Sequence, residues 1–513
     1  MRAESNLSIA SFAYCSLILL GGCGGNSTGP PQFSITVSPS SVNVAAEASQ
    51  QFSATVTGSS NTAVTWQVNG VSGGNATVGT VTDTGLYTAP GAATTATVSA
   101  ALETDSSKSA SANVTVLPPH RIGTRPTPTI SEFFDRTTGN TFIPRGSNYV
   151  RLAALNCPDA PPAYHSALDV GLYDASGVQA VLTLMQTNGY NLVRIWLNGW
   201  CQDNTIGNPL GGLSTAYLAN LVDFLQKAKS HGIYVILTID WVPLFGGYEN
   251  DYSGCTQFNN YNTLNLCAGG VEANTSFFHD LVQGLIAQQA LLDGIFAYEL
   301  RNEYYYNSDL PPLSWTSGTV TTADAQTYDM SSETSRQQMM DNGLIYFTKQ
   351  GRAAILGLDP TALVTVGFFV PQRPNITRVG DPRVIQVYPA VANSVADFVD
   401  LHPYALSGGL TLQQYVQNFG FTQAQQQTQP VIMAEFGELQ SDYPVESTAA
   451  KIAHDWQVQS CTYGFKGWAW FTWDTTNAEY DLVGGPRYWS ATMGSGLINQ
   501  ALAPAVRPDP CVN

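Results

Sequence analysis

Two short segments combine carboxylates with amide and aromatic side chains in a spacing that suits acid–base chemistry. The first, YELRNEYYYN at residues 298–307, places Asn302 and Glu303 directly after an apolar run. A strand that merely ends in a turn carries Gly, Pro, Asn or Asp at that point, so this charged and aromatic end indicates a site. The second, PVIMAEFGE at residues 430–438, ends another apolar run with Glu435.

Paired carboxylates suit the cleavage of a glycosidic bond, in which one carboxyl protonates the leaving oxygen and the other attacks the anomeric carbon or activates water. Arg194 lies within the apolar run NLVRIWL and needs an anionic partner, because a buried charge is costly alone. We expect Glu435 to be that partner, which keeps it ionised and nucleophilic. Tyr404 can donate to the same carboxylate, and Asn302 can bond the 2-hydroxyl of a sugar.

Other polar and aromatic residues at the ends of apolar runs are candidate supports. We expect His402 to orient a catalytic carboxylate; the alternative is a core histidine with satisfied hydrogen bonds. Trp470 or Trp473 is expected to form a sugar platform, and Asn148 ends the first run. The candidates for subsites and the cleft wall are Trp200, Trp241, Tyr248, Tyr304, Tyr305, Tyr306 and Trp315.

Two further glutamates are rivals for the catalytic roles. Glu299 alternates in phase with Glu303 but lies earlier in its run, so we expect it to pair with Arg301 or Arg194. Glu438 follows Glu435 by three residues and is expected at the rim, with the nucleophile as its alternative role.

These residues belong to a region of alternating apolar runs and helical patterns. Near-continuous apolar strands with crossover helices predict a parallel sheet covered on both sides, and eight such units predict a (β/α)8 TIM barrel. Insertions are expected after the third and fourth strands, at 241–276 and 304–335. The eight runs are 142–150, 191–197, 234–240, 294–300, 362–369, 397–402, 430–436 and 467–473.

Composition limits the partners. The chain has 513 residues and a formal net charge of −17, with 12% charged and 11% aromatic residues. A surface this acidic disfavours nucleic acid, anionic lipid and polyanionic substrates. A neutral poly- or oligosaccharide is the more natural partner, because its C–H faces stack on aromatic rings. We expect a monomer without a cofactor or bound metal.

The amino terminus has the features of a targeting segment. Arg2 precedes an apolar run from Leu7 to Leu20, which is too short to span a bilayer comfortably. The run ends Leu20-Gly21-Gly22-Cys23, which resembles a bacterial lipobox. We therefore expect a signal peptide at 1–22, lipidation of Cys23 and a tether at 23–31. The implied location is the periplasm or cell surface, through an outer-membrane lipid anchor or by plain secretion.

Residues 32–117 have a different sequence pattern, in which short runs of alternating apolar and polar residues are separated by turn residues. That spacing predicts an all-β sandwich with Trp66 in its core. The stretch GTVTDTGLYTAP at 79–90 resembles bacterial immunoglobulin-like group 2 domains, which implies a stalk; a carbohydrate-binding module is the alternative. A Pro-rich linker is expected at 118–129 and the barrel at 130–513.

Six cysteines remain after Cys15 and Cys23 are assigned to the signal and the lipid. An even number in an oxidising compartment favours three disulfides among 15 possible connectivities. The expected pairs follow sequence order: Cys157–Cys201, Cys255–Cys267 and Cys461–Cys511.

The motifs FIPRGSN, NLVRIWL, YELRNE, DLHPY, AEFGE and GWAWFTW, in this order along the chain, resemble clan A glycoside hydrolases, most closely family 5 of the cellulase and mannanase type. The resemblance implies a retaining mechanism on β-glucan or β-mannan, with Glu303 as acid/base and Glu435 as nucleophile. The third run departs from the pattern, because it ends with Asp240-Trp241 where the family often has a histidine. The alternatives are an inactive glycan-binding lipoprotein and a transglycosylase.

Overall fold

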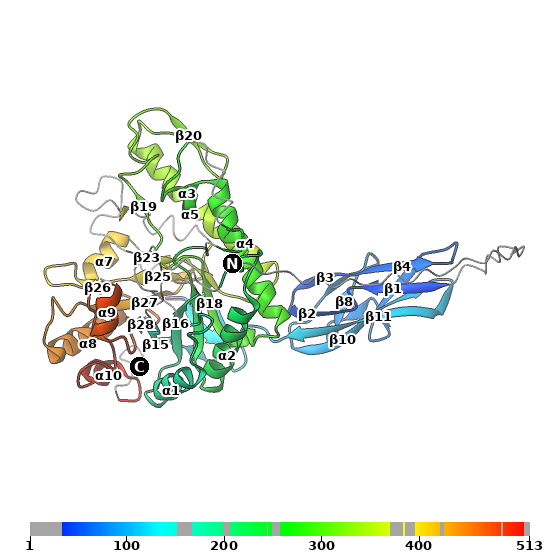
Figure 1. The fold of residues 1–513 in the computed structure, drawn as a ribbon, viewed down its shortest axis with the longest axis horizontal. Coiled ribbons are helices and arrows are strands. Elements are labelled where there is room, and N and C mark those ends of the chain that lie inside the picture. Colours follow the sequence, from blue (N-terminus) through cyan, green and yellow to red (C-terminus); the bar gives the residue numbers. More distant parts are fainter. Residues whose placement is uncertain are drawn as a thin grey trace, which may run out of the picture.

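The computed structural model describes residues 33–150, 167–197, 206–243, 245–248, 257–369, 383–384, 395–420, 425–483 and 486–506. Figure 1 shows an elongated arm of strands that projects from a larger body of strands and helices. The lipidation candidate Cys23 and the expected signal and tether lie outside the described residues.

The arm is an all-β domain built from short alternating strands. Its sheets have the strand orders β1-β4, β2-β11-β10-β5-β6 and β3-β9-β8-β7. Trp66 is buried in their common core, as expected, together with Tyr87. The strands are β1 Ser34–Ser38, β2 Ser41–Ala45, β3 Ser49–Gln51, β4 Ser53–Thr57, β5 Val64–Val68, β6 Val71–Ser72, β7 Gly74–Asn75, β8 Gly79–Val81, β9 Leu86–Thr88, β10 Thr94–Leu102 and β11 Asp105–Leu117.

The body is a (β/α)8 barrel, which confirms the predicted fold class. Its parallel strands follow the order β22-β18-β17-β16-β15-β28-β27-β25-β23, and β22 and β23 are two halves of the fifth barrel strand. Each of the eight predicted runs supplies one barrel strand. The strands are β15 Arg145–Asn148, β16 Leu192–Trp196, β17 Tyr234–Thr238, β18 Ile295–Glu299, β22 Val364–Thr365, β23 Gly367–Phe369, β25 Val399–His402, β27 Val431–Glu438 and β28 Trp468–Trp470.

Helices surround the barrel and bury their apolar faces against it. Serine or threonine caps begin several of them: Ser214 and Ser332 accept from backbone N–H groups of α2 and α5, and Thr411 forms a capping box with Gln414 in α7. The helices are α1 Ala175–Thr187, α2 Thr215–Ser230, α3 Thr263–Leu266, α4 Ala268–Ala287, α5 Glu333–Leu356, α7 Leu412–Phe419, α8 Glu446–Thr462, α9 Asn477–Val483 and α10 Leu497–Leu502, with short 3-10 turns at Leu292–Gly294 and Gln425–Gln427.

The segment expected to be a linker contains a strand. β12 (Ile122–Arg125) pairs with β13 (Glu132–Asp135), which pairs with β14 (Thr141–Phe142). Ile122 and Phe133 are fully buried among barrel residues such as Phe296 and Ile432. The Pro-rich composition hid this strand, whose few apolar residues help to fill the barrel interior.

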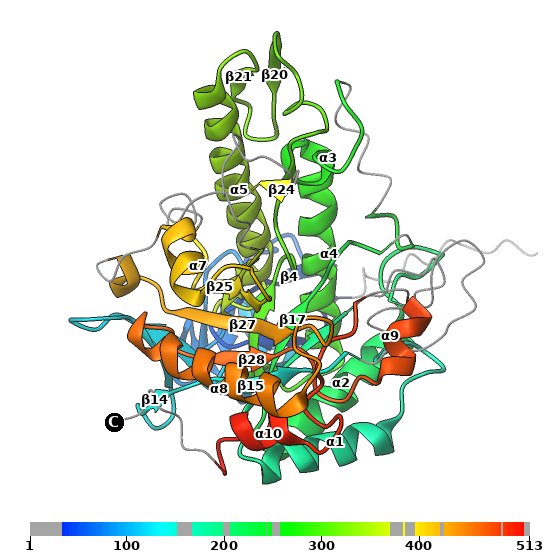
Figure 2. The same cartoon turned by 90° about the vertical axis from the view of Figure 1, so that its left-hand side faces the viewer.

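The loops after β17 and β18 form an extension beyond the barrel. Figure 2 shows α3, β20 and β21 above the strands, next to the upper part of α5. The extension contains β19 Tyr306–Asn307, β20 Thr319–Thr321 and β21 Thr327–Asp329, and the remaining short strands are β24 Arg383–Val384 and β26 Tyr404–Ala405. It lies where the insertions were predicted.

Among the described residues, no helix is both long enough and apolar enough to cross a membrane. Cys267 and Cys461 are disulfide-bonded. The other four expected disulfide cysteines, Cys157, Cys201, Cys255 and Cys511, lie outside the described residues, so the expected pairing stays a prediction.

Candidate active site

Arg194 lies at the centre of a buried polar cluster inside the barrel. The parallel register pairs Asn148 of β15 with Arg194 of β16, so the two side chains leave the sheet on the same side. The guanidinium donates to both oxygens of Glu299 at 2.8 Å, to Glu435 Oε2 at 2.9 Å, to Asn148 Oδ1 at 3.0 Å and to Asn302 Oδ1 at 2.5 Å. The predicted partner Glu435 is therefore present, and Glu299 is a second one.

The Glu435 carboxylate is held by three groups. Arg194 donates to Oε2, the Tyr404 hydroxyl donates to Oε1, and His402 Nδ1 lies 3.6 Å from Oε2. Burial raises the pKa of Tyr404 well above its usual value, so the phenol keeps its proton and remains a donor. Burial also raises the pKa of Glu435, and His402 and Arg194 oppose this rise.

Glu303 faces the same space from the end of β18. Its Oε1 lies 3.4 Å from His402 Nδ1, and the side chain is 25% exposed. One carboxylate oxygen each of Glu303 and Glu435 and one ring nitrogen of His402 all lie within 4.8 Å of one another. The structure therefore brings the two predicted catalytic carboxylates together, with the histidine between them.

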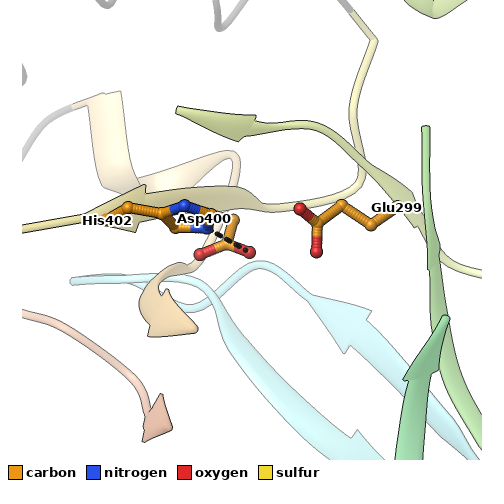
Figure 3. A group of neighbouring side chains, drawn as sticks. All are labelled: Glu299, Asp400 and His402. Atoms are coloured by element: carbon orange, nitrogen blue, oxygen red, sulfur yellow. Dashed lines mark ion pairs between the residues drawn. The ribbon is translucent and has the colours of Figure 1, made fainter. Parts of the chain in front are cut away.

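Asp400 completes the cluster and was missed in the sequence. It precedes His402 by two residues on β25, so both side chains face the barrel interior. His402 Nε2 lies 3.6 Å from Asp400 Oδ2, while Asp400 Oδ1 accepts from the backbone N–H of Ala434 at 2.9 Å. Figure 3 shows the Asp400 carboxylate next to the His402 ring, with Glu299 close by. The alternation in DFVDLH was the signal for this position.

The charge of His402 depends on these neighbours. Burial opposes the imidazolium, but Glu435 and Asp400 outweigh it and raise the pKa of His402 to about 10. These acidic neighbours favour the imidazolium form, and the position of His402 between Glu303 and Glu435 supports the expected orienting role.

The Asn302 amide is fixed on both sides. Its oxygen accepts from Arg194, and its nitrogen donates to Asp240 Oδ1 at 2.7 Å. Asp240 follows β17, at the position where the third run departs from the family pattern. The Asn148 nitrogen donates to the backbone oxygens of Ala434 and Trp470 at 3.0 and 3.2 Å. Asn148 thus ties β15 to β27 and β28 and positions Arg194.

The predicted tryptophan platform is wrong. The Trp470 indole is 0% exposed and donates to the backbone oxygen of Trp489, and Trp473 is 1% exposed and packs edge-on against Tyr190. Neither ring can present a face to a sugar. A tryptophan that faces the cleft and a tryptophan that packs between the strand and the surrounding helices follow the same every-second-residue spacing. The sequence alone therefore does not show on which side of the sheet Trp470 lies.

The tyrosines after the acidic motif divide into two groups. Tyr304 and Tyr306 are fully buried and share a hydrogen bond of 2.7 Å between their hydroxyls, and Tyr248 is also buried. Tyr305 is partly exposed. Trp241 and Trp315 are also partly exposed, whereas Trp200 lies outside the described residues.

The two rival glutamates are placed away from the catalytic roles. Glu299 is fully buried in its pair with Arg194, and burial raises its pKa to about 7 against the opposing effect of that arginine. Glu438 is 1% exposed, not at the rim, and neither of its carboxyl oxygens has a hydrogen-bond partner in the part of the chain that the structure describes. Burial raises the pKa of Glu438 to about 9.

Glu299, Asp400 and His402 are spaced closely enough to hold a metal ion, but a positive charge is already present beside them. Ligand atoms of Glu299, Asp400 and His402 lie within 4.8 Å of one another. Both Glu299 oxygens, however, already accept from the Arg194 guanidinium at 2.8 Å. That guanidinium balances the carboxylates and would repel a second cation.

Comparisons with known proteins give the family. The model of the family described as Cellulase (glycosyl hydrolase family 5) matches residues 163–479, more than half of the chain. No curated protein matched the sequence.

Similar solved structures include the exo-beta-1,4-mannosidase Op5Man5 from Opitutaceae bacterium strain TAV5, with 17% identity and a TM-score of 0.48, covering 73% of this chain and 61% of that one. An endo-beta-1,4-mannanase from Thermotoga petrophila has the same identity and TM-score and covers 72% and 78%. The beta-mannanase of the blue mussel Mytilus edulis has 16% identity and a TM-score of 0.42, covering 76% and 98%.

The family model, which spans most of the barrel with its buried arginine and paired carboxylates, decides the assignment. The chain belongs to the cellulase family, glycosyl hydrolase family 5, and is by that membership an O-glycosyl hydrolase.

Proposed function

We propose that the protein is a retaining glycoside hydrolase that cleaves β-linked neutral polysaccharide, a β-glucan or β-mannan. Glu303 is the acid/base and Glu435 is the nucleophile. The family membership supports the reaction class, and the net charge of −17 favours an uncharged substrate.

The separation of the two carboxylates is the observation that carries the mechanism. The carboxyl groups lie about 5–5.5 Å apart in retaining enzymes and roughly 6.5–9.5 Å apart in inverting enzymes, which need room for a water molecule. One oxygen of Glu303 and one oxygen of Glu435 lie within 4.8 Å of each other. This spacing favours direct attack by Glu435 over activation of water.

The reaction then proceeds in two displacements. Glu435 attacks the anomeric carbon as the glycosidic C–O bond breaks, and the proton of Glu303 goes to the leaving oxygen. Water next attacks the same carbon, its proton passes to Glu303, and the bond to Glu435 breaks. The product has the β-configuration of the substrate, and both glutamates return to their starting states.

The surrounding side chains suit these roles. Arg194 and the His402 imidazolium offset the cost of burying the Glu435 charge, and Tyr404 donates to its other oxygen. The same three groups stabilise the carboxylate that departs in the second step. Asn302, fixed between Arg194 and Asp240, is oriented for the sugar 2-hydroxyl.

The amino-terminal part is proposed to deliver the barrel to its substrate. Signal cleavage before Cys23 and lipidation of that cysteine would anchor the chain on the outer membrane, with the domain at 32–117 as an immunoglobulin-like stalk. The β2 residue Asn43 donates to the backbone oxygens of Ile286 and Ala287 at the end of α4. This contact supports a stalk that holds the barrel in one orientation.

The test measures reducing sugar released from β-glucans, β-mannans and xylans by the wild type, Glu303→Gln and Glu435→Gln. Cleavage of one polymer, with losses of roughly 10²–10⁴-fold in each variant, supports the assignment. A β-anomer as the first product in NMR supports retention, and an α-anomer overturns it. Binding without cleavage would favour a glycan-binding protein, and longer products with an added acceptor would favour a transglycosylase.

A further inference from the structure

A cavity of about 560 Å³, here called the junction cavity, lies where the base of the arm meets the barrel. Strands β2 and β11 of the arm line one side, and the end of α4 lines the other. The volume falls within the about 300–1,000 Å³ that is typical of small-molecule sites. No charged residue occurs in the described lining, although the whole chain has a net charge of −17. The junction cavity is therefore a neutral hollow on an acidic molecule.

The two sides of the junction cavity are held at a fixed separation. The Asn43 side chain donates to the backbone oxygens of Ile286 and Ala287 at 3.3 and 3.4 Å. Ala45 and Ala48 of the arm are buried in the same apolar cluster as the barrel helices. The cavity is thus formed before any ligand arrives, which lowers the entropic cost of binding.

Amide side chains supply much of the polar lining. Gln50 and Asn113 come from the arm, and Gln283 and Gln289 come from the barrel. Within the described ranges, the side chains of Asn113, Gln283 and Gln289 form no hydrogen bond with another residue. An amide offers both N–H donors and an acceptor oxygen. These groups can therefore bond a ligand hydroxyl whether the hydroxyl donates or accepts.

The outer face of the arm sheet continues the same chemistry away from the cavity. Its outward side chains alternate with core residues such as Val98 and Val114. The strand register aligns them in rows across β2, β11 and β10. Two rows next to the cavity are Ser41–Asn113–Thr97 and Asn43–Thr115–Thr95. Every residue in these rows carries a hydroxyl or an amide, so the face that leads into the cavity is polar and uncharged.

This lining fits a neutral ligand with many hydroxyl groups. Val42, Ile286 and Leu358 form an apolar part of the cavity, on which the C–H faces of a sugar ring can pack. An anionic ligand would find no cation in the described lining, and a cationic ligand would find no carboxylate. A purely apolar ligand would leave the amides without hydrogen bonds, which is costly.

The junction cavity lies at the opposite end of the barrel from the catalytic carboxylates. Helix α4 ends at Ala287 and the chain then enters β18 at Ile295, so this loop lies at the amino ends of the parallel strands. Glu303 follows the carboxyl end of β18. A sugar unit in the junction cavity is therefore separated from Glu303 and Glu435 by the length of the barrel.

We propose that the junction cavity is a second carbohydrate-binding site, which holds a segment of neutral polysaccharide while the catalytic cleft acts on another segment. The inference goes beyond the proposed function, because it concerns a surface that takes no part in bond cleavage. Hydrogen bonds to sugar hydroxyls compete with water and contribute little one at a time. Two sites that bind one polymer nevertheless raise the overall affinity through effective concentration. The cavity should therefore affect binding to insoluble polymers and not turnover of short oligosaccharides.

The test measures adsorption of the full chain to insoluble cellulose and insoluble β-mannan, together with kcat/KM for cellohexaose and mannohexaose. The double variant Asn113→Ala with Gln283→Ala removes one amide from each side of the cavity and leaves the Asn43 contacts in place. Gln186→Ala is the matched control, because Gln186 is an exposed glutamine near the end of another barrel helix, α1. We expect the double variant to raise the apparent Kd for the adsorbing polymer at least 5-fold, with hexaose turnover unchanged. The control should match the wild type in both measurements.

The other outcomes separate the cavity from the proposed function. Adsorption of the double variant at the wild-type level overturns the second site while the proposed function stands, and so does a wild type that cleaves hexaoses but adsorbs to neither polymer. Equal losses of adsorption and hexaose turnover also overturn it, because the amides would then act through the barrel. If the wild type cleaves no hexaose but adsorption still depends on the amides, the proposed function fails and the second site stands. If the double variant does not fold, Gln283→Ala alone, on the exposed face of α4, decides the question.

Discussion

Arg194 and Glu299 form a fully buried bidentate ion pair, with Nε and Nη2 each 2.8 Å from a carboxylate oxygen. Such fork-to-fork pairs fix orientation as well as charge. The same guanidinium reaches Glu435 with Nη1. Glu299 has no proposed role in the reaction, but it fixes the orientation of the Arg194 guanidinium and thereby the direction from which Arg194 binds Glu435.

The first prediction concerns this arginine. Arg194→Met should lower the free energy of unfolding by about 3–5 kcal/mol, because removing one partner leaves buried carboxylates uncompensated. It should also abolish activity. Chemical denaturation and the hydrolysis assay measure both effects.

The matched control is Lys451→Met. Lys451 pairs with Asp455 on the surface of α8 and is 74% exposed, so its loss should change stability by less than about 1 kcal/mol. A stable and active Arg194→Met variant would contradict the central role of the buried pair.

The second prediction concerns Asp400, which acts as a positioning residue through His402. Glu435 and Asp400 raise the pKa of His402 to about 10 despite burial, so Asp400→Asn should lower that pKa. NMR titration of the His402 ring should show the shift, and the alkaline limb of the pH profile of kcat should move to lower pH.

The raised pKa of His402 also determines how the stability of the fold changes with pH. A histidine whose pKa is about 6.5 in the unfolded chain and about 10 in the folded chain stabilises the fold fully below pH 6.5. That contribution disappears as the pH rises toward 10, and in Asp400→Asn it should disappear at a lower pH. Asp359→Asn is the control, because Asp359 is a buried carboxylate that bonds His120 instead. An unchanged His402 titration in Asp400→Asn would contradict the prediction.

Local sequence patterns were sufficient to predict the barrel fold and most of the residues that surround Glu435. Buried parallel strands are continuous apolar runs, so Arg194 stood out as a charge that required a partner. Trp470 shows what such patterns do not predict. A ring packed between strand and helices and a ring in the cleft have the same spacing along the sequence. Asp400 could have been found from its alternation with His402 in DFVDLH, but its bond to the backbone N–H of Ala434 joins two strands of the folded barrel, and no local pattern contains such a contact.

The third prediction concerns Glu438. Burial raises its pKa to about 9, and no hydrogen bond to its carboxyl oxygens occurs within the described ranges. The folded state therefore binds a proton that the unfolded state releases near pH 4.5, so stability falls as the pH rises from there toward 9. Glu438→Gln should remove this loss and raise Tm at pH 8 relative to the wild type.

Activity in Glu438→Gln should remain at the wild-type level, because the Glu438 carboxylate does not belong to the group formed by Glu303, His402 and Glu435 in the described part of the chain. Glu435→Gln is the matched comparison three residues earlier on the same strand. Loss of activity in Glu438→Gln at a wild-type Tm would instead make Glu438 the nucleophile.

The fourth prediction concerns Gly367, where the split fifth barrel strand passes behind the site. A Cβ at this position would lie 1.9 Å from the backbone oxygen of Asn302 and 2.4 Å from Glu299 Oε1. The Gly367 N–H donates to Arg301 O at 2.9 Å, and its carbonyl accepts from Tyr304 at the same distance. Gly367→Ala must therefore push the Asn302-Glu303 segment away from Arg194 and His402.

We expect Gly367→Ala to lower kcat at least 100-fold, because displacement of a catalytic group by about 1 Å can cost that much, and to lower Tm. Gly357→Ala is the control, since a Cβ there would come no closer than 3.2 Å to a backbone oxygen of its own helix. Full activity in Gly367→Ala would mean that the segment carrying Glu303 tolerates displacement, and the short separation of the two carboxylates would then not be required for the reaction.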